Sequence, residues 1–191
     1  MIITVTGASA SGKTTIVNRL IESNEKPKLN VLVSHTTRPM RPGEVNGVDY
    51  FFVSKDEFDK VDFVEKAEYA KEWYGTSRDE VTRKNALPGA VITVVDANGQ
   101  RALKDIYGSD VVSIFVRVNE DTLERRLRER DGHVRAAWRI MNMTRTKDHI
   151  PVIKDYDFIV DNDECIDYAV IKTAEYINAK IEERANKDGR E

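Results

Sequence analysis

The chain has 191 residues, of which 40% are hydrophobic and 33% are charged, and its formal net charge is −3. This is the composition of an ordinary globular protein of about one domain, and it excludes a disordered chain and a protein that coats nucleic acid. The single cysteine, Cys165, excludes an internal disulfide, and no group of Cys and His has zinc spacing. No apolar run has the length of a membrane helix, so we expect a cytoplasmic protein with no membrane partner.

The first predicted elements are a β-branched apolar strand at residues 1–6, MIITVT, and a helix at 13–23 with its apolar residues on one face. Between them lies GASASGKTT (7–15), which matches the pattern G-x-x-x-x-G-K-[ST] in the expected context of strand and helix. Backbone N–H groups of such a loop surround a phosphate, and the helix N-terminus points at the same anion. The predicted ATP-binding residues here are Gly7, Ala8, Ser9, Ala10, Ser11, Gly12, Lys13, Thr14 and Thr15.

Three side chains of this loop have more specific predicted roles. Lys13 is long enough to reach the β- and γ-phosphates, and the Thr14 hydroxyl is placed to ligate the Mg²⁺ that accompanies ATP. Thr15 can add a phosphate contact. The loop alone does not name a reaction, because switches, motors and kinases share it.

The rest of the chain alternates mostly between strands and helices. Strands are predicted at 29–35, 89–96, 109–118 and 157–162, and helices at 97–107, 120–130, 134–146 and 164–185. This alternation predicts a parallel sheet with helices on both faces. Cys165 is expected to be a small buried side chain.

Residues 34–84 interrupt this alternation and predict an inserted subdomain. They contain SHTTRPMRPGEVNGVDYFFV, in which Arg38 and Arg41 lie close together in a rigid segment rich in Pro and Gly. Two guanidinium forks and a tyrosine hydroxyl are suited to binding a phosphate, so this segment predicts a second phosphate site. The alternative is a solvated basic loop.

With these residues the chain resembles the guanylate kinases. The similar stretches follow one another in order over nearly the whole length: SHTTRPMRPGEVNGVDYFFVSKDEF, DFVEKAEYAKEWYGTS, VITVVDANG and IVDND. The resemblance implies a P-loop NTPase-type α/β core at 1–33 and 85–191, a nucleoside-monophosphate-binding subdomain at 34–84, and a short helical lid at about 128–145. It implies transfer of the γ-phosphate of ATP to GMP or dGMP with Mg²⁺, in a monomer or homodimer that binds no nucleic acid.

The resemblance also implies roles for residues of the insert. Arg38, Arg41, Tyr50 and Tyr74 would hold the phosphate of GMP, and the residues that would face the guanine are Ser34, Glu65 and Thr76. Guanine presents two adjacent N–H donors, so a carboxylate can accept from both, whereas adenine would leave that carboxylate unpaired. Glu68 is the alternative to Glu65, although the spacing to Tyr74 favours Glu65.

Asp96 ends a predicted central strand, where ligands of parallel sheets bind. It would orient water around Mg²⁺ or touch the acceptor nucleotide. The family usually has a second acid two residues earlier and Gln two residues later, whereas this chain has Val94 and Asn98. A kinase for a wider range of (deoxy)nucleoside monophosphates is therefore an alternative. A non-catalytic interaction module is another, although such modules typically lose the phosphate loop.

The predicted lid lies in RRLRERDGHVRAAWRIMNMTRTKDH, residues 125–149. Cations that close over a transferring phosphoryl group stabilise its charge, and the family uses one arginine of the lid and one of the next helix. Arg130 and Arg139 match these best, and Arg135 is the alternative for the lid. The implied catalytic set is Lys13, Arg38, Arg41, Arg130 and Arg139, and the resemblance adds Arg130 and Asn162 to the ATP site.

Overall fold

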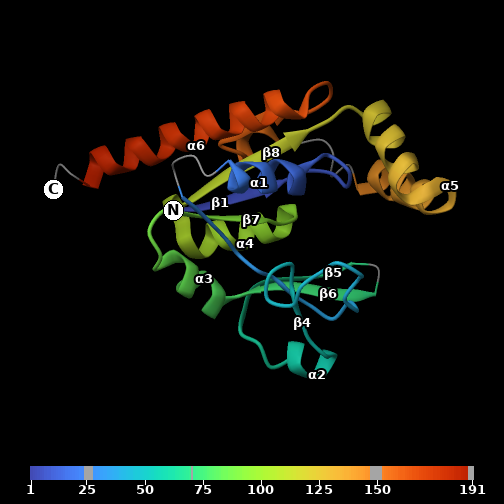
Figure 1. Ribbon diagram of the computed structural model, residues 1–191, viewed down its shortest axis with the longest axis horizontal. Coiled ribbons are helices and arrows are strands. Elements are labelled where there is room, and N and C mark those ends of the chain that lie inside the picture. Colours follow the sequence, from blue (N-terminus) through green and yellow to red (C-terminus); the bar gives the residue numbers. More distant parts are fainter. Residues whose placement is uncertain (24–27, 70, 147–151, 189–191) are drawn as a thin grey trace.

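The computed structural model describes residues 1–23, 28–69, 71–146 and 152–188, and it contains two sheets (Figure 1). The larger sheet has five strands in the order β2-β7-β1-β8-β9, and every neighbouring pair is parallel. Its strands are β1 (Ile2–Thr6), β2 (Leu29–Val31), β7 (Ala90–Val94), β8 (Val111–Arg117) and β9 (Phe158–Asp161). The predicted parallel sheet is confirmed.

Helices cover both faces of this sheet (Figure 1). Ile3 packs in one buried cluster with side chains of α1 (Lys13–Glu22) and α6 (Ile166–Asp188). Its neighbour Ile2 faces the other way and packs with α3 (Arg78–Asn85) and α4 (Ala97–Tyr107). A strand buried on both faces must be apolar at successive positions, which is why MIITVT and AVITV read as continuous apolar runs. The short helices η1 (Gly108–Asp110) and η2 (Ile153–Asp155) precede β8 and β9.

The second sheet has four strands in the order β4-β3-β6-β5 and lies within residues 34–84. Its strands are β3 (His35–Thr36), β4 (Phe51–Phe52), β5 (Phe63–Tyr69) and β6 (Glu72–Ser77). The one-turn helix α2 (Lys55–Phe58) starts with a capping box between Ser54 and Glu57. Phe58 is fully buried and packs its ring 4.3 Å from that of Phe63, so α2 closes one side of this small core.

The strand predicted at 29–35 is too long. The Leu32 N–H still bonds to the Ile92 carbonyl of the larger sheet, but the Val33 N–H donates to the buried Glu80 carboxylate at 3.2 Å. His35 already belongs to the second sheet. The chain therefore changes sheets at 32–34, and the apolar character of this crossover reflects burial rather than strand pairing.

The two helices predicted at 120–130 and 134–146 form one element, α5 (Glu120–Thr146), with a break at Gly132. The backbone of Gly132 (φ 72°, ψ 168°) is accessible almost only to glycine, so the kink is encoded by this residue. Figure 1 shows α5 beyond the carboxyl ends of the central strands. Ligands of parallel sheets bind at this edge.

The prediction that Cys165 is buried is wrong: the thiol is exposed, because it lies in the turn between β9 and α6. Among the described helices, none combines the length and the apolar character that crossing a membrane requires.

Candidate active site

The loop after β1 is shaped to present backbone N–H groups. Gly7 (φ 141°), Ala10 (φ 68°) and Gly12 (φ 95°) adopt positive φ angles, which turn the chain tightly back on itself. Helices α2, α3 and α4 each start with a side chain that caps their first N–H groups, whereas no side chain among the described residues caps α1. The N-cap residue of α1 is Gly12, which has no side chain to cap the helix, and the helix dipole favours an anion at this end.

Both glycines of the motif are required by their surroundings as well. A Cβ atom on Gly7 would lie 2.5 Å from the Val116 carbonyl oxygen, and one on Gly12 would lie 2.3 Å from Nδ2 of Asn162. That amide donates to the Ser11 carbonyl at 2.8 Å, and Asn162 is 1% exposed. Asn162 thus holds the phosphate loop against the end of β9 through a buried hydrogen bond.

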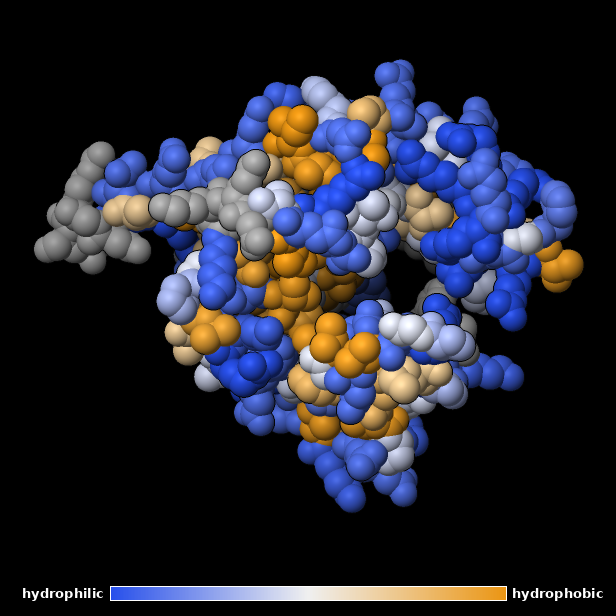
Figure 2. Space-filling model, viewed as in Figure 1, coloured by the Kyte–Doolittle hydropathy of each residue, from blue (hydrophilic) through white to orange (hydrophobic). Residues whose placement is uncertain are grey.

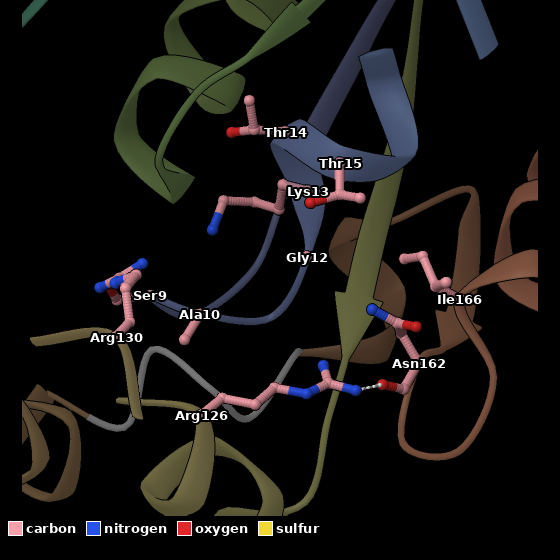
Figure 3. Close-up of a pocket in the computed structure, with 10 residues that line it drawn as sticks. All are labelled: Ser9, Ala10, Gly12, Lys13, Thr14, Thr15, Arg126, Arg130, Asn162 and Ile166. Atoms are coloured by element: carbon pink, nitrogen blue, oxygen red, sulfur yellow. Dashed lines mark hydrogen bonds between the residues drawn. The ribbon is translucent and has the colours of Figure 1, made fainter. Parts of the chain in front are cut away.

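The loop forms the floor of a pocket of about 440 Å³ (Figure 3). Its lining residues are Ser9, Ala10, Gly12, Lys13, Thr14, Thr15, Arg126, Arg130, Asn162 and Ile166. The ammonium group of Lys13 donates to the carbonyls of Gly7 and Ala8, at 2.8 and 2.7 Å. The pocket therefore combines N–H donors with an ammonium group and two guanidinium groups, an arrangement suited to a polyanion.

Arg130 and Arg139 converge on the phosphate loop from either side of the Gly132 kink. Their guanidinium groups donate to the Ser9 hydroxyl at 3.2 and 2.9 Å. Both also pair with Asp131 at 2.8 Å, and the hydrogen bond from Arg130 lowers the pKa of this carboxyl group. The structure thus brings together Arg130, predicted for the lid, and Arg139, predicted for the next helix, while Arg135 is exposed.

Arg126 lines the pocket but was not predicted as a site residue. Its Nη2 donates to the Asn162 carbonyl at 2.7 Å and to the Asp163 carbonyl at 3.3 Å. Burial lowers the pKa of Arg126, and the neighbouring Arg125 adds to this effect. The signal in the sequence is spacing, because Arg126 lies four residues before Arg130 and so shares its helix face.

Arg38, Tyr50 and Tyr74 meet on the second sheet. The guanidinium carbon of Arg38 lies 5.5 Å from the ring centroids of both Tyr50 and Phe52, and the rings of Tyr50 and Tyr74 are 5.9 Å apart. Hydrogen bonding to Glu44 is the main cause of a raised pKa for Arg38, and burial raises that of Tyr50. The side chain of Arg41 is exposed beside them.

Ser34, Thr76 and Glu65 form a connected polar group. Glu65 of β5 lies directly opposite Thr76 of β6, whose hydroxyl donates to the Glu65 carboxylate at 2.7 Å. The Ser34 hydroxyl lies 3.3 Å from that of Thr76. Burial raises the pKa of Glu65, the charge of Asp96 raises it further, and the hydrogen bond from Thr76 opposes the shift. Glu68 is exposed, whereas Glu65 is half-buried and hydrogen-bonded to Thr76.

The polar group on the second sheet faces the same edge of the central sheet as the phosphate loop. Asp96 caps α4 by accepting the Gly99 N–H at 2.7 Å, and a Cβ on Gly99 would lie 3.2 Å from the Glu65 carboxylate. Asp96 follows β7, which pairs directly with β1. Figure 2 shows the surface hollowed between the second sheet and the hydrophilic α5 region, so the two polar sites open into one cleft.

The residues at the carboxyl ends of the central strands fit a hard divalent cation that takes few ligands from the protein. The Thr14 hydroxyl lines the pocket, and Asp96 is exposed on the neighbouring strand end. In the part of the chain that the structure describes, no three His, Cys, Asp or Glu side chains form a metal cage. Mg²⁺ suits such a site, because it prefers oxygen and keeps several ligands as water and phosphate oxygens.

Comparison with known proteins gives a consistent result. The family model described as "Guanylate kinase" matches residues 1–180. The guanylate kinase of Legionella pneumophila (strain Lens) is 33% identical over 97% of this chain and 90% of its own length. That of Rhodopseudomonas palustris is 40% identical over 81% of this chain and 71% of its own. The crystal structure of guanylate kinase from Anaplasma phagocytophilum superposes with a TM-score of 0.67 at 26% identity, covering 94% of this chain and 85% of that one.

Proposed function

The chain belongs to the guanylate kinase family, and from this premise we propose how its residues carry out the family reaction. The enzyme transfers the γ-phosphoryl group of ATP to GMP and releases ADP and GDP. The observation that carries the residue assignment is the cleft between two separate polar sites, one on the phosphate loop and one on the second sheet.

The phosphate loop is the proposed donor site. The uncapped N-terminus of α1 and the loop N–H groups bind the β- and γ-phosphates of ATP, and Lys13 exchanges the Gly7 and Ala8 carbonyls for phosphate oxygens. Arg126 and the outer pocket near Ile166 receive the rest of the nucleotide. Asn162, which we expected in the ATP site, has a second proposed role, since its buried amide holds the loop.

The second sheet is the proposed acceptor site. Arg38, Arg41, Tyr50 and Tyr74 bind the phosphate of GMP, because the two arginines supply charge and the two hydroxyls supply short, directed donors. The acceptor oxygen of this phosphate is already ionised at neutral pH. Transfer therefore requires no protein base and no covalent intermediate, and the protein contributes orientation and charge stabilisation.

Glu65 selects guanine in this proposal. Its carboxylate, held by Thr76 and backed by Ser34, accepts the N1–H and the exocyclic amine of the base. Adenine presents an acceptor at N1, so a buried carboxylate would lose hydrogen bonds in that complex. Asp96 lies near enough to act on the pKa of Glu65 and is proposed to line the same side of the acceptor.

The phosphoryl transfer of this family needs a divalent metal, which we propose to be Mg²⁺. Thr14 would ligate it directly, and Asp96 would reach it through water. When bound, the ion neutralises phosphate charge and holds the donor phosphates in line. The chain itself orients the two phosphates, and closure over the cleft excludes water, which would otherwise accept the phosphoryl group.

Arg130 and Arg139 are the proposed lid cations. Both already contact Ser9, at the edge of the donor site, so a small movement brings them onto the transferring group. Asp131 balances their charge while no phosphate is present. These residues stabilise the charge that spreads over the phosphoryl oxygens in the transition state.

Release of ADP, measured by a coupled assay with ATP and a panel of acceptors, tests the function. GMP should be the fastest of the ribonucleotides by at least about 100-fold in kcat/KM, since a site built to bond one base rejects others strongly. dGMP belongs in the panel, because no described side chain has a predicted contact with the ribose 2′-hydroxyl. Equal turnover of GMP, AMP and CMP would contradict the assignment, and so would a wild-type protein without turnover.

A further inference from the structure

A carboxylate lies inside the site proposed for the acceptor phosphate. Glu44 is bonded to Arg38 and to the backbone of Arg41, the two residues assigned to binding a dianion. Simple charge repulsion suggests that an acid should be excluded from such a site. Its position follows from the turn at residues 41–44.

A tight turn fixes Glu44 in place. The Glu44 N–H donates to the Arg41 carbonyl at 3.1 Å, and the two residues between them are Pro42 and Gly43. Proline at the first central position and glycine with φ 88° at the second fit a type II turn. The turn brings the Glu44 carboxylate back onto the Arg41 N–H, at 2.7 Å.

The same carboxylate also accepts hydrogen bonds from Nη1 and Nη2, the terminal nitrogens of the Arg38 guanidinium group. Oε1 accepts from Nη2 at 2.7 Å and Oε2 from Nη1 at 3.0 Å, while the Pro39 carbonyl accepts from Nη1 at 2.7 Å. The two side chains are only 11% and 19% exposed, and the rings of Tyr50 and Phe52 flank the guanidinium. Arg38 has little freedom to rotate.

This arrangement leaves one edge of Arg38 for a ligand. A guanidinium has five N–H donors, and Glu44 and Pro39 together use three. The two that remain are on Nη2 and Nε, which share the side edge. Among the described residues, Tyr74, itself proposed to bind the phosphate, also interacts with this guanidinium group. Two parallel donors on one edge match the bidentate geometry of a phosphate. By contrast, Arg130 already donates from Nε and Nη2 to Asp131.

We infer that Glu44 is a positioning residue: it fixes Arg38 and the Arg41 turn so that the open edge of the guanidinium meets the phosphate of GMP. This inference rests on the proposed function. It makes a prediction opposite to that of simple charge repulsion. If Glu44 only repelled the phosphate, its removal would tighten GMP binding, whereas loss of a positioning contact weakens it.

Calorimetric titration of GMP and of guanosine separates these possibilities. Glu44→Gln should weaken GMP binding about tenfold, since a charge-assisted bidentate pair is lost, and should leave guanosine binding unchanged. Glu44→Asp keeps the charge but is too short to hold Arg38 and the Arg41 amide together, so it should also weaken GMP binding. The matched control is Glu68→Gln, which removes an exposed carboxylate from the same sheet and should change neither affinity.

A double-mutant cycle gives the second readout. In an Arg38→Lys background, which lacks the planar fork, Glu44→Gln should cause no further loss of GMP affinity. Wild-type affinity for GMP in both Glu44 variants, tighter binding in Glu44→Gln, an additive loss in the cycle, or an equal loss for guanosine would each overturn the inference. A wild-type protein that does not bind GMP would instead overturn the proposed function, and the inference with it.

Discussion

At Glu65, the carboxylate that we propose to bind guanine also destabilises the folded chain. Burial raises its pKa, so the ionised form is less favourable in the folded chain than in the unfolded one. We expect Glu65→Gln to lower kcat/KM for GMP about 100-fold, because the amide offers guanine a donor where an acceptor is needed. The same substitution should stabilise the fold by about 1 kcal/mol at pH 7, or about 2–4 °C in Tm. Steady-state kinetics and thermal unfolding of the two proteins measure both effects, and a lower Tm would contradict this account.

The pKa shift of Glu65 also predicts how stability depends on pH. Between the unfolded value near 4.5 and the higher folded value, the native state binds more protons than the unfolded state. The contribution of this group to stability is therefore greatest below pH 4.5 and falls as pH rises through the folded pKa. The Tm advantage of Glu65→Gln over wild type should be small at pH 4.5 and largest near pH 7. A difference in Tm that is independent of pH would show that Glu65 carries no such shift.

Lys13 is the cation that we propose to bind the phosphates of ATP at the donor site. Lys13→Ala removes the ammonium group that we place on the phosphates, so kcat should fall by at least about 10²–10³-fold in the ADP-release assay. The control is Lys28→Ala, because Lys28 is exposed and lies outside the cleft. Retention of more than about a tenth of wild-type kcat by Lys13→Ala would contradict the role given to this residue.

At the scale of the elements, the kink in α5 sets the position of the lid arginines. Gly132→Ala would force a side chain into a backbone conformation open almost only to glycine, at a cost of about 1–3 kcal/mol, or would straighten the helix and carry Arg139 away from Ser9. We expect kcat to fall about tenfold while GMP affinity is retained.

The chain offers a matched control for this prediction. Gly108 also has a positive φ, and a Cβ there would meet no atom within 4 Å, as at Gly132. Gly108 lies at the start of η1, before β8 and far along the chain from the lid. Gly108→Ala should therefore reduce Tm without changing kcat. Equal effects of the two substitutions on kcat would show that the kink has no role in transfer.

The elements could be predicted where local chemistry determines them. The spacing of Gly7, Gly12 and Lys13 predicts the loop, and uninterrupted apolar runs predict the central strands. The end of β2 could not be read from sequence, because the apolar residues continue past Val31 to Leu32 and Val33, and only the Val33–Glu80 hydrogen bond shows where pairing stops. The bridge from Glu44 to Arg38 was missed for a related reason, since it depends on a turn that reverses the chain.

In the whole molecule, the phosphate loop and the second sheet face each other, although they come from different parts of the sequence. Parallel strands bring the loop after β1 and Asp96 after β7 to one edge, and the crossover at 32–34 places the second sheet opposite that edge. Glu65 and Gly99 lie in close contact at this junction, so the proposed base site packs on the core through α4.

The central claim is that one cleft holds two independent phosphate sites, one for ATP and one for GMP. Crossed binding measurements test it most directly: GMP and ATP are each titrated calorimetrically into Lys13→Ala and into Arg38→Met. Lys13→Ala should weaken ATP binding at least about tenfold and leave GMP affinity within about twofold, and Arg38→Met should do the reverse. The two-site account is contradicted if either substitution weakens the binding of ATP and of GMP equally. It is also contradicted if Lys13→Ala weakens mainly GMP binding and Arg38→Met mainly ATP binding.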